Sequence, residues 1–228
     1  MKILALDFSG EPRGVALLEG TPPDMWEVRA EMEQRGGRSV PALAMVGRVL
    51  EETGWDRSEV EAIAVGLGPG SYTGIRAALA LAQGWFLARG VAVYGANSMD
   101  SVAARAWGAG LRGRVRVVVD AQRRELYVAG YELRQEGWCR VEPLRLEAVE
   151  RLQQANDRAD WIWVGPEVDR WFSEGRLMGP SAVEVGRLAA REAPRRPEAW
   201  EPIYLRPVQF VKAQPVVGGT VVTSEGVP

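Results

Sequence analysis

Two segments of this 228-residue chain repeat one order of elements: an apolar strand, an aspartate, a turn and a second strand. The first unit joins Ile3–Asp7 to Gly14–Leu18, and the second joins Arg114–Asp120 to Glu125–Tyr131. An internal duplication leaves such a pattern, so the chain is expected to form two related halves. Two ordinary hairpins that are alike by coincidence would give the same pattern, and the residues alone leave both explanations open.

The rest of the chain alternates strands with helices, which indicates an α/β protein. Ser39 and Gly54 suit the N-cap and the C′ position of one helix. We place the boundary between the halves near Gly108–Gly110, which divides the chain into residues 1–108 and 109–228. A Pro/Gly-rich tail follows Pro207, and its last part, Gly218–Pro228, is expected to be loosely ordered. Further elements are predicted at Trp26–Met32, Ala62–Val65, Ile75–Arg89, Val91–Tyr94, Ser98–Trp107, Trp161–Val164 and Ser181–Glu192.

Composition excludes several classes of chemistry. The chain has no histidine, which rules out Ser-His-Asp and Cys-His catalysis and every metal site that needs imidazole. Its single cysteine, Cys139, cannot form an internal disulfide, which fits a reducing compartment. No apolar run approaches the length of a membrane span, so we expect a cytoplasmic protein without membrane contact. The formal charge of −2 disfavours unaided binding to nucleic acid.

The two aspartates end strands at positions suited to phosphate chemistry. A strand that ends in Asp before a Ser-Gly turn can surround a phosphate with N–H groups while the carboxylate orients a metal-bound water. Two such hairpins facing across a cleft hold ATP in the actin and hexokinase superfamily. The second turn here has Gln-Arg-Arg at residues 122–124, where backbone approach to phosphate requires glycine. We therefore predict a degraded nucleotide site, whose candidate remnants are Asp7, Ser9, Gly10 and Asp120.

A glycine-rich loop, Gly66–Gly74, precedes the helix predicted at Ile75–Arg89. The N–H groups at the start of a helix can attract an anion, but this loop lacks the lysine of a Walker A motif. A simpler interpretation, which we favour, is that the glycines shape a tight turn and that Ser71 or Thr73 caps the helix.

The helix at residues 75–88 has too narrow a polar face for an ordinary surface helix. Small residues recur along it at a spacing of four, which would let another helix approach closely. Burial inside a single core would explain the same pattern, whereas the functional interpretation is that one face packs on a partner chain. Candidate interface residues are Ala80, Leu81, Gly84, Trp85 and Ala88.

Two other features allow a functional and a structural interpretation. The arginines at positions 112, 114, 116, 123 and 124 are a candidate patch for a phosphate or an acidic partner, although a solvated strand face explains them more simply. The nine tryptophans could stack on bases, but Trp161, Trp163 and Trp171 have the spacing of packing residues.

Four motifs, in this order along the chain, together resemble the TsaB (YeaZ) family: Ile3–Asp7, Gly68–Arg76, Asp120–Tyr127 and Pro202–Arg206. The resemblance implies an actin-like fold of two related α/β halves. It also implies a non-catalytic subunit of the complex that adds a threonylcarbamoyl group to the adenosine beside the anticodon of tRNA. In that family the reaction belongs to the paralogue TsaD, whose metal is held by histidines, and the absence of histidine here agrees with this division.

The resemblance also implies the partners. TsaB-like proteins pair with TsaD through helices of the N-terminal half, and the ATPase TsaE joins the complex. We accordingly expect no cofactor, no bound metal, contact with tRNA only through the complex, and a possible homodimer when the chain is alone. The sequence departs from the family at Phe8, at Ser9–Gly10 and at Arg38, which precedes Ser39 where a histidine is usual.

Two other functions remain open at this point. The first is an active ATP-dependent kinase or ATPase of the same superfamily, with Asp7 and Asp120 holding magnesium; a working clamp should then carry glycines in the second turn. The second is a structural homodimer with no role in tRNA modification, because a ridge of small residues would serve a self-interface equally well.

Overall fold

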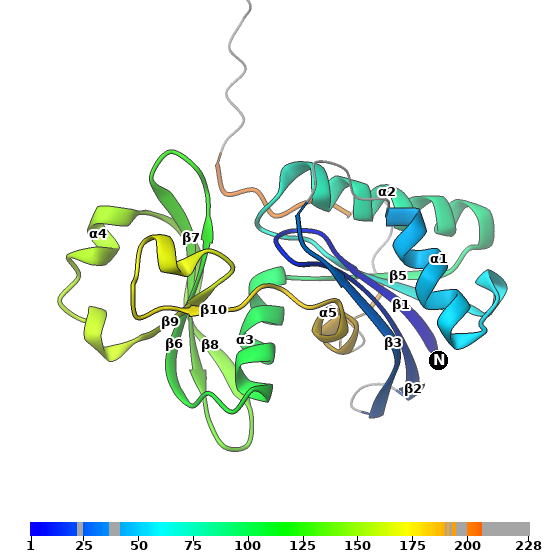
Figure 1. Cartoon of the computed structure of the whole chain (residues 1–228), viewed down its shortest axis with the longest axis horizontal. Helices are drawn as coiled ribbons and strands as arrows, with labels where there is room; N and C mark the ends of the chain where they lie inside the picture. Colours follow the sequence, from blue (N-terminus) through cyan, green and yellow to red (C-terminus); the bar gives the residue numbers. More distant parts are fainter. Residues whose placement is uncertain (22–24, 37–41, 190, 192, 195–199, 207–228) are drawn as a thin grey trace, which may run out of the picture.

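The computed structural model describes residues 1–21, 25–36, 42–189, 191, 193–194 and 200–206. In this part of the chain the strands form two five-stranded mixed sheets (Figure 1). The first sheet contains β1 (Lys2–Asp7), β2 (Arg13–Thr21), β3 (Met25–Gln34), β4 (Ala62–Gly66) and β5 (Ala92–Ala96). The second contains β6 (Gly113–Asp120), β7 (Glu125–Leu133), β8 (Trp138–Ala148), β9 (Ile162–Gly165) and β10 (Arg176–Leu177).

Both sheets have the same topology. Their orders are β3-β2-β1-β4-β5 and β8-β7-β6-β9-β10 when the second is read in the same direction. In each sheet the first three strands pair antiparallel, and the fourth and fifth strands continue parallel to the first. The two hairpins noticed in the sequence are β1–β2 and β6–β7, each at the centre of its sheet. The predicted actin-like fold of two related α/β halves is thereby confirmed.

Helices cover both sheets. They are α1 (Ala42–Thr53), α2 (Tyr72–Arg89), α3 (Ser98–Gly108), α4 (Val149–Gln153) and α5 (Ala182–Ala189). Short 3₁₀ turns lie at Arg57–Glu59, Arg158–Asp160 and Val168–Arg170. Alternate residues of β1 point to opposite faces of the first sheet. Leu4 and Leu6 pack with α1 and α2, whereas Ile3 and Ala5 pack with α5. The central strand is therefore buried on both sides.

Helices α3 and α5 lie between the two sheets (Figure 1). Helix α3 packs on β6 and β7 of the second sheet, and α5, although later in the chain, packs on β1 and β2 of the first. The helices also contact each other, and Ser181 N donates to Ser101 Oγ at their junction (3.3 Å). The predicted boundary between residues 108 and 109 stays a prediction. Helix α3, which ends at Gly108, packs on the second sheet although the prediction assigns it to the first half.

Local signals explain where the helices begin and end. Gly54 adopts a left-handed φ of 70° after α1, as its C′ position requires, while Ser39 lies outside the described residues. Ser71 caps α2 by accepting a hydrogen bond from Gly74 N (3.2 Å), so this helix begins three residues earlier than predicted. The predicted tail after Pro207 also lies outside the described residues. No helix in the described part is long and apolar enough to cross a membrane.

Candidate functional site

Helices α1 and α2 border an apolar groove of about 680 Å3. All five residues predicted as an interface line it. The complete lining is Ala42, Leu43, Val46, Arg57, Ala77, Ala80, Leu81, Gly84, Trp85, Ala88 and Arg89. Helices α1 and α2 lie on the face of the first sheet opposite α5 (Figure 1).

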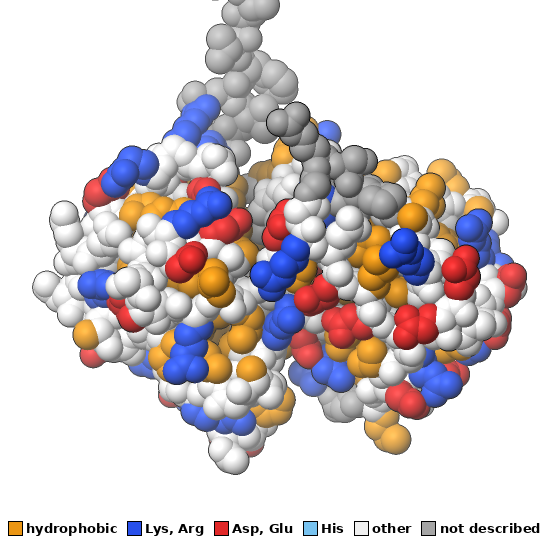
Figure 2. All heavy atoms as spheres, in the orientation of Figure 1, with side chains coloured by type: hydrophobic (Ala, Val, Ile, Leu, Met, Phe, Trp, Pro, Cys, Tyr) orange, Lys and Arg blue, Asp and Glu red, His pale blue; other side chains and the backbone are white. Residues whose placement is uncertain are grey.

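The floor and rim of this groove are exposed. Ala80, Gly84 and Ala88 are all exposed, and a Cβ added to Gly84 would have no neighbour within 4 Å. Leu43, which also lines the groove, has an exposed fraction of 68%. Hydrophobic side chains reach the surface over these helices in Figure 2. Burial in the core therefore does not explain Ala80, Gly84 and Ala88, and an apolar face of this kind is typical of a surface that another chain covers.

A second cavity, of about 510 Å3, lies between the halves. Its wall includes Ser9, Gly10 and Asp120, three of the four predicted remnants of a phosphate site. The fourth residue, Asp7, is not part of that wall. The other lining residues are Glu11, Arg13, Gly70, Ser71, Tyr72, Val119, Ala121, Gln122, Tyr127, Pro166, Glu167, Arg170 and Tyr204.

Asp7 is completely buried beside Gly66 of β4. Its Oδ1 atom accepts hydrogen bonds from Ser9 N (2.8 Å) and Ser9 Oγ (2.6 Å). Its Oδ2 atom is buried without a hydrogen-bond partner among the described residues. Burial raises the pKa of Asp7, and the polar groups of Ser9 and, to a smaller extent, the hydroxyl of Ser98 oppose this effect without cancelling it. The carboxyl group therefore stabilises the first turn and does not reach the cavity.

The glycine-rich loop packs directly on the first turn. Ser71 N donates to Ser9 O (2.6 Å), which joins the start of α2 to the turn after β1. A Cβ on Gly70 or Gly74 would collide with the carbonyl oxygens of Ser9 and Phe8, respectively. These glycines therefore permit close approach of two backbones. Together with the cap at Ser71, this contact supports the interpretation of the loop as a tight turn.

The second turn has an unusual backbone. Gln122, Arg123 and Arg124 have φ values of 63°, 58° and 59°, so three successive residues with side chains are left-handed. Each costs about 1–2 kcal/mol relative to an ordinary conformation. Asp120 Oδ1 accepts a hydrogen bond from Gln122 N (2.7 Å), and Arg170 approaches Asp120 Oδ2 at 3.9 Å. Asp120 thus already has partners from this chain.

A C-terminal segment crosses the cavity between the halves along a path that the sequence did not predict. We call Trp200–Arg206 the C-terminal strap. Ile203 N donates to Leu67 O in the first half (2.8 Å), and Arg206 forms an ion pair with Glu125 in the second. Between these contacts Tyr204 stacks on Tyr72. The motif Pro202–Arg206 was the only sequence signal for this contact.

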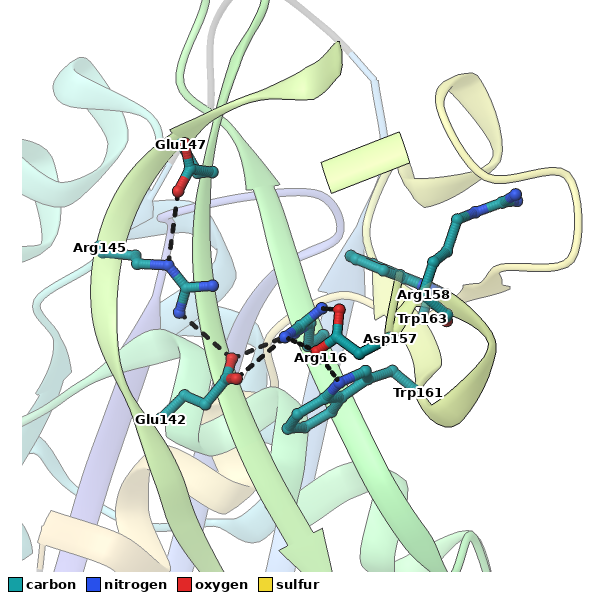
Figure 3. A network of polar contacts seen from close by, with 8 residues as sticks. All are labelled: Arg116, Glu142, Arg145, Glu147, Asp157, Arg158, Trp161 and Trp163. Carbon is teal, nitrogen blue, oxygen red and sulfur yellow. Dashed lines mark hydrogen bonds and ion pairs between the residues drawn. The ribbon is translucent and has the colours of Figure 1, made fainter. Parts of the chain in front are cut away.

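Part of the predicted arginine patch is structural (Figure 3). Arg116 is only 4% exposed and forms ion pairs with Glu142 (2.9 Å) and Asp157 (2.7 Å). Trp161 Nε1 donates to Asp157 Oδ2 (3.1 Å), and its ring lies under the Arg116 guanidinium. The hydrogen bond from Arg116 lowers the pKa of Asp157. Trp161 and its neighbour Trp163 are buried, as the packing interpretation predicted.

The described residues contain no group of three or more His, Cys, Asp or Glu side chains that could hold a metal ion. Within this part of the chain, the geometry therefore offers an exposed apolar groove and a cavity between the halves. Asp120 lines that cavity and is bonded within its own turn, whereas Asp7 is buried outside the cavity wall.

Comparisons with known proteins agree with this geometry. Residues 39–188 match the family model for TsaD, tRNA N6-adenosine threonylcarbamoyltransferase. The tRNA threonylcarbamoyladenosine biosynthesis protein TsaB of Escherichia coli is 31% identical over 227 aligned positions, which cover 90% of this chain and 95% of that protein. This chain belongs to the TsaB (YeaZ) family. TsaB of Haemophilus influenzae is 28% identical, with coverage of 90% and 94%. The structure of YeaZ from Pseudomonas aeruginosa superimposes with a TM-score of 0.74 at 28% identity and covers 90% of this chain and 99% of that one.

Proposed function

We propose that this chain is a non-catalytic subunit of the complex that adds a threonylcarbamoyl group to the adenosine beside the anticodon of tRNA. In this proposal it pairs with the catalytic paralogue TsaD, the ATPase TsaE joins them, and tRNA is bound only by the assembled complex. The names of its relatives, which refer to threonylcarbamoyladenosine biosynthesis, support the pathway.

The observation that carries the pairing is the exposed groove between α1 and α2. Ala80, Gly84 and Ala88 line it without adding bulk, while Leu81 and Trp85 supply apolar area beside them. Small residues on a helix face let a second helix approach closely, so that many weak contacts add up. The groove thus suits a helical partner with an apolar face.

The geometry of the cavity supports a non-catalytic role. Magnesium in an actin-like ATPase would need free carboxylates, but Asp7 is buried in its own turn and Asp120 is bonded to Gln122. The alternative of an active kinase or ATPase is therefore disfavoured. A peptidase, which the description of one Pseudomonas aeruginosa structure mentions for YeaZ, would have to work without histidine.

A substitution at Gly84 tests the pairing. We expect Gly84→Leu to weaken binding to TsaD from the same source by roughly 5- to 150-fold, because overpacking costs about 1–3 kcal/mol. The isolated chain should stay folded, since the position is open and leucine is a better helix former than glycine. Binding is measured by calorimetry, and modification of a tRNA transcript by mass spectrometry.

The matched control is Gln83→Leu, which places the same side chain on an exposed neighbour outside the groove lining. It should leave both pairing and modification unchanged. Normal pairing of the folded Gly84→Leu protein would show that the partner binds elsewhere. A structural homodimer without a role in tRNA modification predicts a different result, namely that TsaD fails to displace the second copy in size-exclusion chromatography with light scattering.

A further inference from the structure

Two aromatic rings and a guanidinium group form a stack on the surface at the mouth of the cavity between the halves. Tyr72, the first residue of α2, is 55% exposed, and Tyr204 of the C-terminal strap is 37% exposed. Their ring centroids lie 5.6 Å apart at an interplanar angle of 24°. The Arg76 guanidinium lies 4.2 Å from the centroid of the Tyr72 ring, and Arg76 Nε donates to Tyr204 Oη (3.4 Å). The stack is thus preassembled.

The left-handed turn at residues 122–124 reaches the same cavity through Gln122, and Arg123 is the next residue along the turn. Arg206 of the C-terminal strap donates to Gln122 O (3.5 Å), only two residues after Tyr204, and Gln122 lines the same cavity as both tyrosines. Arg124 pairs with Glu150. Arg123, at the centre of the turn, is exposed and forms no ion pair within the described part of the chain. We call Tyr72, Arg76, Arg123 and Tyr204 the arginine–tyrosine rim.

The chemistry of this rim matches RNA. Unstacked bases of RNA loops pack on aromatic rings and on guanidinium planes, while unpaired arginines bind phosphates. An acidic protein surface would use the arginines but would not require exposed, parallel rings beside them. Consecutive left-handed residues with side chains are costly, and such strain is concentrated at functional positions. Here the strained turn carries the unpaired Arg123.

We propose that the arginine–tyrosine rim contacts the tRNA in the assembled complex. This inference rests on the function proposed above. The aromatic rings would receive an unstacked base, and Arg123 a phosphate. The chain as a whole has a formal charge of −2, so these few contacts add to binding supplied by the partner and are weak alone.

The test uses the complex of this chain with TsaD and a fluorescent, unmodified tRNA transcript, with the dissociation constant measured by anisotropy at several salt concentrations. Arg123→Ala should make the slope of log affinity against log salt shallower by about 0.7–0.9, the value for one phosphate contact. Tyr72→Leu should weaken binding by about 5- to 150-fold, the loss of one stacked base. Tyr72→Phe retains the ring and should bind normally.

Arg134→Ala is the matched control, because Arg134 is 58% exposed and follows the opposite end of β7. It should change neither the affinity nor the slope. Wild-type behaviour of both Arg123→Ala and Tyr72→Leu would overturn the inference. Loss of TsaD pairing by either variant would also overturn it, because the rim would then be part of the protein interface. Failure of the wild-type chain to pair with TsaD would instead refute the proposed function, and with it the assignment of the rim to tRNA.

Discussion

Arg116 and Asp7 are both buried, but their charges are compensated to different degrees. Arg116 is buried with two carboxylates and a tryptophan ring around it, so its charge is compensated. Asp7 is buried with one oxygen bonded to Ser9 and the other without a partner in the described residues. An uncompensated carboxylate in a protein interior is unfavourable. Asp7 is therefore the residue at which a conservative change should increase stability.

The effect of Asp7→Asn should depend on pH. The pKa of Asp7 is raised in the folded state from an ordinary value of 3.8. As the pH rises above about 4, the unfolded chain loses the proton first, so the wild type loses stability by up to about 1.4 kcal/mol per pH unit until the folded pKa is passed. Asp7→Asn lacks this loss, so its advantage over the wild type should grow with pH. Urea unfolding at pH 4, 5.5 and 7 measures it, and a difference independent of pH would contradict the explanation.

At the level of elements, α2 carries two glycines with opposite roles. Gly74 faces the turn after β1, where a Cβ would collide with Phe8 O, whereas Gly84 faces open space in the groove. The first glycine is required by packing inside the chain. The second has no such requirement in the isolated chain, and helix propensity alone would favour alanine there.

These two glycines form a matched pair of substitutions. Gly74→Ala should destabilise the protein by about 1–3 kcal/mol, because one backbone must move away from the other. Gly84→Ala should stabilise the isolated chain by about 1 kcal/mol, because alanine is the better helix former. Denaturant midpoints of both variants check the prediction. Equal effects at the two positions would show that the contact with Phe8 O does not constrain the helix.

The sequence predicted most elements, and the failures have physical causes. β1, β2, β4 and β6 were evident because apolar runs fill strands that are buried on both faces. The edge strands β8 and β10 were missed, because four charged residues and Pro143 interrupt the apolar residues of β8, and β10 has only two residues. The left-handed turn at residues 122–124 was also missed, because glycine is the usual sequence signal for a positive φ and the turn contains none.

The candidate sites were predicted to a similar degree. Regular spacing on α2 was enough to predict the five groove residues, because a helix converts a spacing of four into one face. The contribution of α1 and the path of the C-terminal strap depend on contacts between residues far apart in the chain. Asp7 was interpreted as a cavity residue because its position at the end of a strand does not show which way the carboxyl group turns.

At the scale of the whole molecule, the two halves enclose a cavity whose wall includes three of the four residues predicted as remnants of a phosphate site. We expect isothermal calorimetry with magnesium and ATP to detect no useful binding by the isolated chain, because neither aspartate is free and no lysine lies in the glycine-rich loop. A dissociation constant in the low micromolar range, about 8 kcal/mol of binding free energy, would contradict the non-catalytic interpretation.

The isolated chain should also fail to bind tRNA specifically. Its formal charge is −2, and several arginines near the cavity are already paired with carboxylates, as Arg124 and Arg206 are. Filter binding at physiological salt should therefore show only weak retention that decreases with added salt. Tight retention that depends on the anticodon loop would argue for a direct RNA-binding role of the lone chain.

The packing of α5 on the first sheet has a consequence for protein synthesis. The ribosome releases β1 to β5 long before residues 182–189, so the inner face of that sheet, including Ile3 and Ala5, has no helix to cover it during most of translation. The nascent first half should therefore be a client for chaperones, and ribosome-bound chains that end before Ser181 should be more sensitive to protease than chains that extend beyond Ala189.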